Sequence, residues 1–275
     1  MKISDVINKQ WVDPSSLTEI YQSASPFPHI VITDFIINNI LEAVHDEFPD
    51  LLKLKEKDKD KVIKYETNKE TKLVSEGTQA LSPSALYLNS YLQSDSMMNW
   101  LNKLTGIKEP LISDPYLSGG GYHETKTGGF LKVHADFNKH PKLNLDRRLN
   151  LLIYLNKNWK DEYGGALQLF DKNIDNAIQT IFPRFNVAVI FSTNSYSYHG
   201  NPDPIKSPED RPRRSLAYYY YSTGRPEGEI LTEKHPTLFK ERKGEKFAHK
   251  FTVKGFLRDF IPPIVLKTFK SLVKK

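Results

Sequence analysis

Two histidines and an aspartate in this sequence have the residue types of a metal site. His134 and Asp136 are two positions apart, in a segment that enters from the apolar residues after Phe130. Residues i and i+2 of a β-strand point to the same face, so this pair can offer one nitrogen and one oxygen to a single ion. His199 follows Asp136 after 63 positions, which suits a ligand from another strand. We therefore predict that these three residues form one metal site.

Two imidazoles and one carboxylate on one side of a metal ion leave its other positions open, as in the non-haem Fe(II) sites that react with O2. The alternative is a surface strand in which His134 only hydrogen-bonds Asp136. The chain has 8 His and 33 Asp or Glu residues, so such pairs also arise by chance. The surrounding segments favour the metal site, because residues 187–191 form a continuous apolar run that leads towards His199, as a buried strand would.

A strand-like segment with two arginines at its start follows this histidine. Residues 213–221 are rich in β-formers and begin Arg213-Arg214. A guanidinium group can bind a carboxylate through two parallel hydrogen bonds. The sequence therefore places a candidate carboxylate-binding cation near the predicted metal ligands.

Five segments occur in an order that resembles a known family. They are Tyr122 with Gly129 before His134-x-Asp136, LIYLNKNW at 152–159, GGALQLF at 164–170, Tyr198-His199-Gly200, and Arg213-x-Ser215-Leu216. In this order they resemble the Fe(II)/2-oxoglutarate-dependent dioxygenases, in particular the prolyl 4-hydroxylase-like branch. The resemblance covers residues 122–222, and residues 26–35 with Glu47-Phe48-Pro49 also resemble the N-terminal edge of these enzymes.

The resemblance implies a role for each candidate residue. Fe(II) would be held by His134, Asp136 and His199. The pattern Arg-x-Ser-Leu selects Arg213 to bind the far carboxylate of 2-oxoglutarate, and Arg214 would then face outward. Tyr154 would assist at the same carboxylate, although a core aromatic is the alternative for it. Tyr122 is a third cofactor-binding candidate, and L-ascorbate is a further cofactor that the resemblance suggests.

The implied reaction is the Fe(II)-, 2-oxoglutarate- and O2-dependent hydroxylation of an unactivated C–H bond. The substrate expected first is a prolyl residue or a similar part of a peptide. The second interpretation is hydroxylation of a small molecule, sugar or lipid-linked intermediate at a membrane surface. The third is a metal-binding jelly-roll module without oxygenase activity, against which the intact ligands and Arg213 argue. Substrate choice resides in loops that the sequence alone does not place.

Composition limits the class of protein. The chain has 275 residues, 39% of them hydrophobic and 12% aromatic, which is enough for a sizeable core. No segment approaches the roughly 18–20 uninterrupted apolar residues that span a bilayer. Residues 1–10 lack the apolar centre of a secretory signal, and the absence of cysteine excludes disulfides and cysteine-ligated metal. We expect a cytoplasmic location, peripheral at a membrane if the tail binds one.

Positive charge is concentrated at the end of the chain. Residues 231–275 hold 12 Lys or Arg and 4 Asp or Glu, an excess of 8 positive charges in a chain whose net charge is +6. The remainder is slightly acidic, so no nucleic-acid partner is expected. Residues 247–275 interleave apolar and basic residues as two short helices divided by Pro262-Pro263, a pattern typical of binding to anionic membrane surfaces. The alternative is a tail that packs on the core with its lysines in water.

The pattern of short strands and Gly/Pro turns predicts an α+β, mainly β fold. We expect a double-stranded β-helix, or jelly roll, with N-terminal helices packed on the sheet and a C-terminal basic amphipathic helical tail. The expected divisions are 1–110 for the N-terminal strand and supporting helices of the same domain, 111–225 for the jelly-roll catalytic core, and 226–275 for the basic tail.

Local signals give further expectations. Residues 38–50 have helical spacing, and one or two amphipathic helices should begin after a capping Ser82 and end near Gly106. The heavily charged residues 51–72 predict a solvated loop or helix face, and His140 is expected to be solvated in a polar loop.

Overall fold

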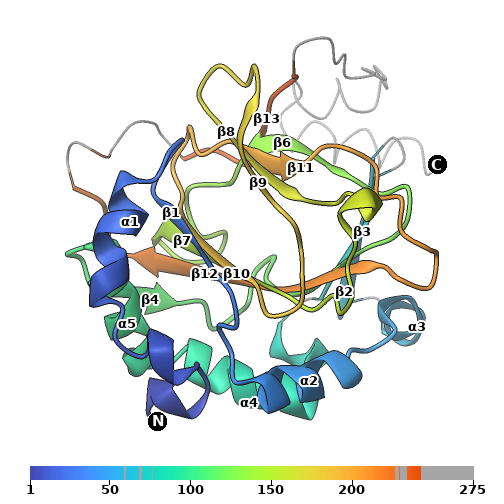
Figure 1. The fold of residues 1–275 in the computed structure, drawn as a ribbon, viewed down its shortest axis with the longest axis horizontal. Helices are drawn as coiled ribbons and strands as arrows, with labels where there is room; N and C mark the ends of the chain where they lie inside the picture. The colour runs from blue at the N-terminus through green and yellow to red at the C-terminus, as the bar shows by residue number, and fades with distance from the viewer. Residues whose placement is uncertain (59, 68–69, 76, 227–228, 230–233, 243–275) are drawn as a thin grey trace, which may run out of the picture. The chain divides into compact units, whose positions relative to one another are not determined.

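The computed structural model describes residues 1–242 except 59, 68–69, 76, 227–228 and 230–233 (Figure 1). Residues 243–275 lie outside the described part, so the helical tail predicted at 247–275 stays a prediction. None of the helices in the described part has the length and apolar character that crossing a membrane requires.

The elements follow one another along the chain. The α-helices are α1 Thr18–Ser23, α2 Asn38–Asp46, α3 Leu51–Lys57, α4 Pro83–Leu92 and α5 Asp95–Thr105. Short 3-10 turns are η1 Ile3–Asp5, η2 Lys9–Trp11, η3 Ser15–Leu17, η4 Thr78–Ala80 and η5 Asp161–Tyr163. The first strands are β1 His29–Ile32, β2 Val62–Thr67, β3 Glu70–Ser75, β4 Ile112–Ser113, β5 Gly121–Thr125, β6 Leu131–Ala135 and β7 Asp146–Tyr154. The later strands are β8 Leu167–Phe170, β9 Ala177–Ile181, β10 Ala188–Ser192, β11 His199–Asn201, β12 Arg213–Ser222 and β13 Leu238–Phe239.

The described strands form two antiparallel sheets. The larger has eight strands, in the order β1-β10-β7-β12-β5-β3-β2 with β4 beside β12, and the smaller has the five strands β13-β6-β11-β8-β9. Figure 1 shows the two sheets curling around a common interior. This is the double-stranded β-helix that the sequence predicted. The boundary expected at residue 225 falls before β13, which pairs with β6.

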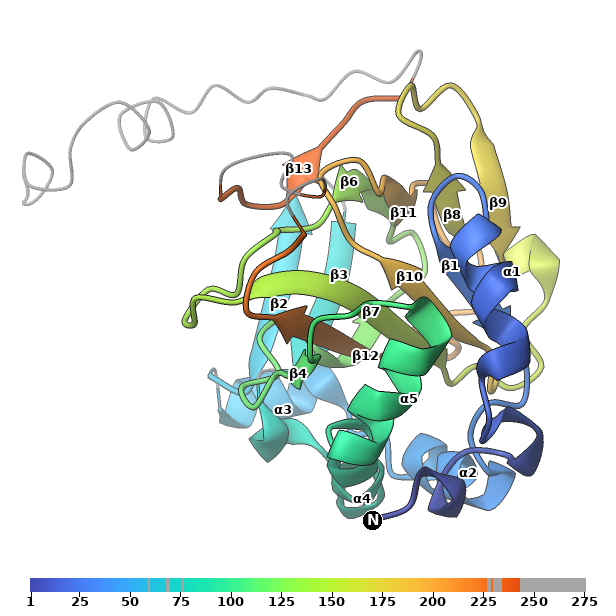
Figure 2. The ribbon, with the colours of Figure 1, turned by 90° about the vertical axis from the view of Figure 1, so that its left-hand side faces the viewer.

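The N-terminal helices cover the outer face of the larger sheet, as predicted, and Figure 2 shows α4 and α5 lying against it. Alternate residues of β7, such as Leu149 and Leu151, are fully buried in one cluster with Leu88 of α4 and Leu101 of α5. Burying each such side chain stabilises the fold by about 1.5–3 kcal/mol. The intervening residues of β7 point into the jelly roll, among them Tyr154.

The predicted helix ends are confirmed. The Ser82 hydroxyl accepts a hydrogen bond from the backbone amide of Ala85, which caps α4, and Ser94 caps α5 in the same way through Met97. Gly106 ends α5 in the left-handed conformation, at a φ of 75°.

The charged residues 51–72 are only in part the solvated helix face that was expected, because Lys53 and Glu56 on α3 are exposed but the segment also enters the sheet. They contain helix α3, strand β2 and the first residues of β3, which pairs with the edge of β5. Leu51, Val62 and Leu73 are each no more than 1% exposed. The burial of these apolar side chains holds the segment against the core, although most of its other residues are charged.

His140 is not solvated either. It is 1% exposed, and its Nε2 lies 3.0 Å from the carboxylate of Asp114. The backbone amides of Lys142 and Leu143 donate hydrogen bonds to its Nδ1. The ring therefore fixes the loop from within.

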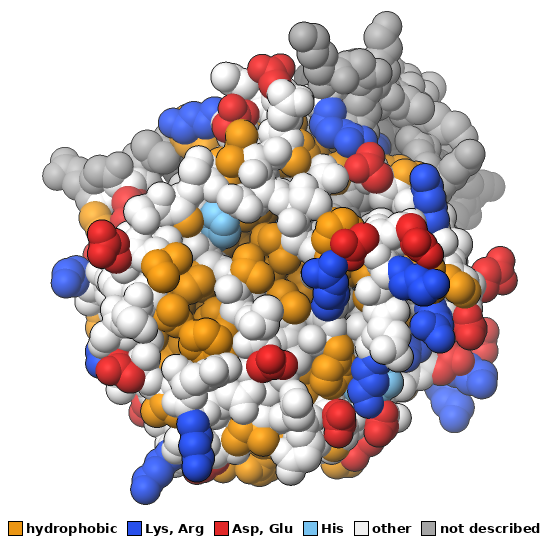
Figure 3. Space-filling view, viewed as in Figure 1, with side chains coloured by type: hydrophobic (Ala, Val, Ile, Leu, Met, Phe, Trp, Pro, Cys, Tyr) orange, Lys and Arg blue, Asp and Glu red, His pale blue; other side chains and the backbone are white. Residues whose placement is uncertain are grey.

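On the surface, charged side chains are frequent toward the margin of the face in Figure 3, while hydrophobic ones gather nearer its middle.

Candidate metal and co-substrate site

The three predicted metal ligands meet on the smaller sheet. His134 on β6 and His199 on β11 are directly opposite each other in the antiparallel register, and Asp136 follows the end of β6. The His134 Nε2 lies 3.6 Å from one oxygen of Asp136, and the His199 Nε2 lies 3.5 Å from the other. One ligand atom from each residue lies within 4.8 Å of those of the others. Adjacent strands thus present two nitrogens and one oxygen to a common point.

Hydrogen bonds set the protonation of both imidazoles. The Nδ1 of His134 lies 2.7 Å from the carbonyl oxygen of Lys132, and that of His199 lies 2.8 Å from the carbonyl oxygen of Ser197. A carbonyl oxygen only accepts, so each Nδ1 must carry the proton. The lone pair is then on Nε2, the nitrogen nearer Asp136, which is the tautomer a metal ligand requires.

Gly200 lets β11 approach β6 closely at the ligands. A Cβ atom at this position would lie 2.7 Å from the carbonyl oxygen of Leu131 and 2.9 Å from that of Lys132. Any side chain would therefore push the two ligand strands apart.

Arg147 and Asn150 orient the carboxylate of Asp136. The Arg147 guanidinium donates a hydrogen bond to it over 3.0 Å, and the Asn150 amide donates another over 2.7 Å. Arg147 also donates to the Asn150 side-chain oxygen. Both residues lie on β7, three positions apart, where a regular strand would turn them to opposite faces. A register shift lets them share a face, because β12 pairs Tyr221 with Arg147 but Tyr220 with Leu149.

These charges hold the site in a metal-binding state. Burial would raise the pKa of Asp136, but Arg147 and the two histidines lower it well below its usual range. Burial, followed by the field of His134, lowers the pKa of His199 to about 4. Near neutral pH, Asp136 is thus an anion and His199 is neutral.

Arg213 and Tyr154 lie together at the inner end of the site. Arg213 is 7% exposed and Tyr154 is fully buried. The Arg213 Nε donates a hydrogen bond over 2.7 Å to the carbonyl oxygen of Gly165, and a terminal nitrogen lies 3.1 Å from the Tyr154 hydroxyl. Gly165 has a φ of 68°, and a Cβ atom at this position would lie 3.1 Å from the Arg213 side chain, so the glycine leaves room for it. These contacts fix the guanidinium and leave further N–H groups for a ligand.

Two cavities meet at the metal ligands. The inner one is about 70 Å³ and reaches from His134, Asp136 and His199 to Arg213. Asn201 also lines it and is 4% exposed, and its side-chain nitrogen has no hydrogen-bond partner in the described structure. The outer chamber is about 160 Å³ and has the aromatic wall Phe130, Phe137, Tyr219 and Phe239. The ligands thus stand between a polar pocket and an aromatic one.

Two candidates, Tyr122 and Arg214, lie apart from this cluster. Tyr122 points into the core beneath the helices, where its hydroxyl lies 2.8 Å from the Ser82 hydroxyl and its ring 4.4 Å from that of Phe48. The next residue on β5, His123, lines the inner cavity instead. Arg214 pairs with Glu124 at 2.8 Å, away from the cavities.

Lys72 is a site residue that the sequence interpretation missed. It lies on β3, opposite Thr125, and lines both cavities. Burial lowers its pKa to about 8, with a contribution from Arg213. Its place in a charged stretch concealed it, since the only signal was the strand alternation that it shares with Val74.

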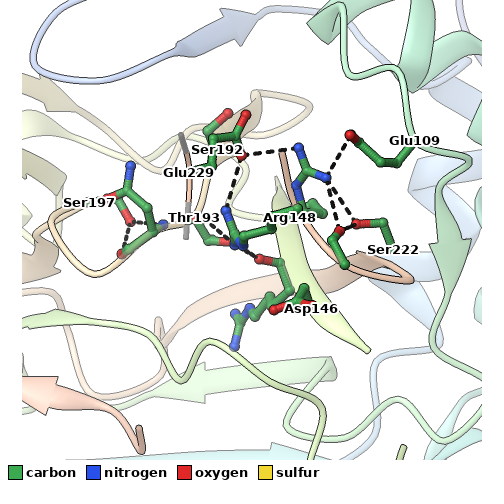
Figure 4. A network of polar contacts seen from close by, with 12 residues as sticks. Glu109, Asp146, Arg148, Ser192, Thr193, Ser197, Ser222 and Glu229 are labelled. Carbon is green, nitrogen blue, oxygen red and sulfur yellow. Dashed lines mark hydrogen bonds and ion pairs between the residues drawn. The ribbon is translucent and has the colours of Figure 1, made fainter. Parts of the chain in front are cut away.

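A separate polar network lies on the other side of β7 (Figure 4). Arg148 donates hydrogen bonds to Glu109, Ser222 and Glu229 at 2.9, 3.0 and 3.2 Å. The Thr193 hydroxyl donates to the carbonyl oxygen of Arg147 over 2.9 Å. This network ties the end of β12 to β7 on the face away from the predicted metal ligands.

Comparison with known proteins gives a consistent result. Residues 120–221 match the family model of the 2OG-Fe(II) oxygenase superfamily. The chain is 28% identical over 232 residues to the prolyl 3-hydroxylase OGFOD1 of Mus musculus, covering 82% of this chain and 37% of the mouse protein. It thus spans little more than a third of that relative's length.

Solved structures share the fold. One is a Trichoplax adhaerens prolyl hydroxylase in complex with a hypoxia-inducible factor peptide fragment, with a TM-score of 0.53, 15% identity and coverage of 76% of this chain and 89% of that one. Another is a prolyl 4-hydroxylase of Phytophthora capsici, with a TM-score of 0.50, 18% identity and coverage of 78% and 66%.

Proposed function

We propose that the chain, whose residues 120–221 match the model of the 2OG-Fe(II) oxygenase superfamily, is a dioxygenase of the prolyl 4-hydroxylase-like branch that hydroxylates a prolyl residue of a peptide. One observation carries the proposal. The matched stretch 120–221 brings two histidines with free Nε2 atoms and one ionised carboxylate to a cavity that ends at the buried cation of Arg213.

The donor set suits Fe(II). Neutral imidazoles and a carboxylate are ligands that Fe(II) accepts, and their placement on one side leaves positions open for other ligands. His134, Asp136 and His199 would hold the ion, which together with 2-oxoglutarate and O2 supplies the oxidising chemistry. Arg147 and Asn150 keep the Asp136 carboxylate in place for it.

Arg213 is suited to anchor 2-oxoglutarate. Its free N–H groups can bind the far carboxylate in a bidentate way, which is worth roughly 1.5–3 kcal/mol. Tyr154 fixes the guanidinium and can donate its hydroxyl to the same carboxylate. The unpartnered amide nitrogen of Asn201 offers one more donor in this cavity. The burial of these groups excludes water from the co-substrate.

The aromatic wall of the outer chamber supports a prolyl substrate. Phe137 and Tyr219 offer flat apolar surfaces next to Asp136, which suit an aliphatic ring that must be held close to the metal. The likeness to two prolyl hydroxylase folds and to the mouse prolyl 3-hydroxylase favours the same substrate class.

The test measures conversion of 2-oxoglutarate to succinate with Fe(II), O2 and ascorbate. We expect wild-type protein to consume 2-oxoglutarate slowly without a peptide, and His134→Ala to abolish this turnover. Arg213→Ala should raise the KM for 2-oxoglutarate at least about tenfold, as loss of the anchoring contact requires. Arg214→Ala is the matched control and should keep the wild-type KM. Wild-type protein that binds neither Fe(II) nor 2-oxoglutarate would refute the proposal.

The basic sequence of residues 247–275 supports a second candidate, in which the substrate is a small molecule or lipid-linked sugar at an anionic membrane. Liposome flotation with phosphatidylserine vesicles tests it, using the full chain and a chain that ends at residue 246. Flotation of the full chain alone would favour this candidate. Equal recovery of both chains in the soluble fraction would argue against it.

A further inference from the structure

The outer chamber holds more positive charge than the components of the proposed reaction cancel. Lys72 and Arg147 both line it, and Asp136 is the one carboxylate among the described residues around the two cavities. If the proposed function holds, the two charges of Fe(II) are balanced by the two of 2-oxoglutarate. Asp136 supplies one negative charge against the three cations Arg213, Arg147 and Lys72, and it pairs directly with Arg147. An excess of two positive charges then remains, and Lys72 and Arg147 hold their charges beside the substrate.

We propose that the substrate carries a carboxylate directly next to the reacting prolyl ring, and that Lys72 and Arg147 bind it. The inference rests on the proposed function and specifies its substrate class, a prolyl residue flanked by an acidic residue in a peptide.

Lys72 is placed to meet such a group. It lies on the same face of β3 as Val74, and both residues line the outer chamber. Lys72 as a whole is half-buried, and its ammonium group makes no hydrogen bond or ion pair within the part of the chain that the structure describes. A partly desolvated cation without a partner gains most from an anion that a ligand brings.

Arg147 has binding capacity left after it has oriented Asp136. It is 1% exposed and lies between the rings of Phe137 and Tyr219, at 4.4 and 3.6 Å from their centres. One of its terminal nitrogens has no hydrogen-bond partner among the described residues. An unpaired donor on a buried charge is costly, so a ligand that satisfies it gains affinity.

The wall and the cations together define the ligand. Phe130, Phe137, Phe239 and Tyr219 suit an apolar ring, while the two cations require an acceptor with negative charge within reach of that ring. A neutral prolyl peptide would fill the aromatic part and leave both cations in a poorly solvated space. The chamber therefore favours acidic over neutral neighbours of the prolyl residue.

The test compares peptides that differ by a single charge. The first pair is acetyl-prolyl-glutamyl amide and acetyl-prolyl-glutaminyl amide, and the second has the acidic or amide residue before the proline. Hydroxylated product is measured by its mass, and the readout is the ratio of kcat/KM for the acidic and neutral members of each pair. A ratio cancels any general loss of activity in a variant. We expect about tenfold preference for the acidic peptide in at least one pair, the difference between a charged and a neutral contact.

Three variants attribute the preference to Lys72. Lys72→Met should lower the ratio several-fold, with Arg147 accounting for what remains, whereas Lys72→Arg should retain most of it. Lys9→Met removes the same charge from an exposed residue outside both cavities and should keep the wild-type ratio. If Lys72→Met does not fold, Lys72→Gln and the dependence of the wild-type ratio on ionic strength take its place.

The failures of the two proposals are distinguishable. Equal rates for both members of each pair overturn this inference and leave prolyl hydroxylation standing. A preference that survives Lys72→Met with full magnitude also overturns it. If no peptide is hydroxylated, the inference fails, and turnover of 2-oxoglutarate without peptide decides separately whether the oxygenase proposal holds.

Discussion

Arg147 and Arg148 are neighbours on β7, yet they serve opposite faces of the strand and meet different partners. Arg147 shares a single carboxylate, Asp136, with two histidines beside the aromatic chamber. Arg148 has two carboxylates of its own, at 2.9 Å in Glu109 and at 3.2 Å in Glu229. Both arginines are nearly fully buried.

The difference in counter-charges distinguishes a cation with binding capacity left from one whose charge is satisfied within the protein. The charge of Arg148 is neutralised by carboxylates of the protein, so its network stabilises the fold without a ligand. The charge of Arg147 is only partly satisfied, and Asp136, the carboxylate with which it pairs, is also one of the three predicted metal ligands. Burial of an arginine therefore says little about its role until its counter-charges are counted.

The largest expected effect comes from removing the shared carboxylate. Asp136→Asn deprives Fe(II) of a ligand and leaves Arg147 with no anion. We expect loss of 2-oxoglutarate turnover beyond the roughly 10–100-fold typical of changes around a metal ligand, and a fall of roughly 3–5 kcal/mol in the free energy of unfolding of the metal-free protein. Succinate formation measures the turnover, and urea unfolding measures the stability. Isothermal titration calorimetry measures Fe(II) binding by each variant. Asp146→Asn, which breaks the pair with Lys139 outside the cavities, is the control and should retain metal binding.

Exchanging each arginine for methionine tests the contrast itself. Arg147→Met should weaken metal binding roughly 10–100-fold, because Asp136 loses its orienting donor. Arg148→Met should leave metal binding unchanged and lower the free energy of unfolding by roughly 1.5–3 kcal/mol through its lost hydrogen bonds to charged groups. The same calorimetry and urea titrations apply. Equal weakening of metal binding by both substitutions would abolish the distinction.

Stability against pH should differ between the two faces. The pKa of His199 is about 4 in the folded protein, and an unfolded histidine titrates near 6.5, so the unfolded state binds more protons between these values. The metal-free protein should lose up to roughly 3 kcal/mol of unfolding free energy as the pH falls from 6.5 to 4. His123, whose pKa burial also lowers, acts in the same direction.

The opposite face should respond only at lower pH. The pKa of Glu109 lies below its usual value despite partial burial, because a hydrogen bond from its own backbone amide and then Arg148 favour its ionised form. Its contribution is therefore lost only on acidification below about 4.5. Urea unfolding at stepped pH in the presence of a chelator resolves the two windows. In His199→Gln, the unfolding free energy should change less with pH between 4 and 6.5. An unaltered dependence on pH in that range would contradict the assignment.

The smallest expected effect concerns Tyr154. Tyr154→Phe removes the hydroxyl 3.1 Å from Arg213 but keeps the buried ring. One hydrogen bond of about 0.5–1.5 kcal/mol corresponds to roughly a two- to tenfold rise in the KM for 2-oxoglutarate. Steady-state succinate formation measures it. An unchanged KM would mean that the ring serves only the packing of the core.

The sequence predicted those parts of the site that depend on local geometry. His134 and Asp136 share a face because of strand alternation, and the apolar run before His199 indicated a second buried strand. The structure brings the three together and places Arg213 inside and Arg214 outside. The cap of α4 at Ser82 and the end of α5 near Gly106 were predicted for the same reason, since each depends on a few consecutive residues.

Other parts depend on tertiary structure and gave no such signal. Arg147 faces the ligands because of a register shift between β7 and β12, and Lys72 does so because a charged hairpin joins the edge of β5. Neither arrangement follows from residue spacing. Tyr122 is a predicted cofactor-binding residue that lies outside the cavity. The glycines before it gave no indication of which residues of β5 face inward, and it is the next residue, His123, that lines the cavity.

The short strand β13 has a kinetic consequence. Leu238 and Phe239 pair with Ala135 and His134, and the amide of Lys240 donates to the carbonyl oxygen of Val133. Phe239 lines the outer chamber with its ring 5.6 Å from that of His134. Because β13 makes so few backbone pairings, it can open locally while the rest of the sheet stays folded. We therefore expect the residence time of a bound ion to depend on how often this strand opens. A chain that ends before residue 237, and so lacks β13, should release the metal faster while its equilibrium affinity for the metal falls less.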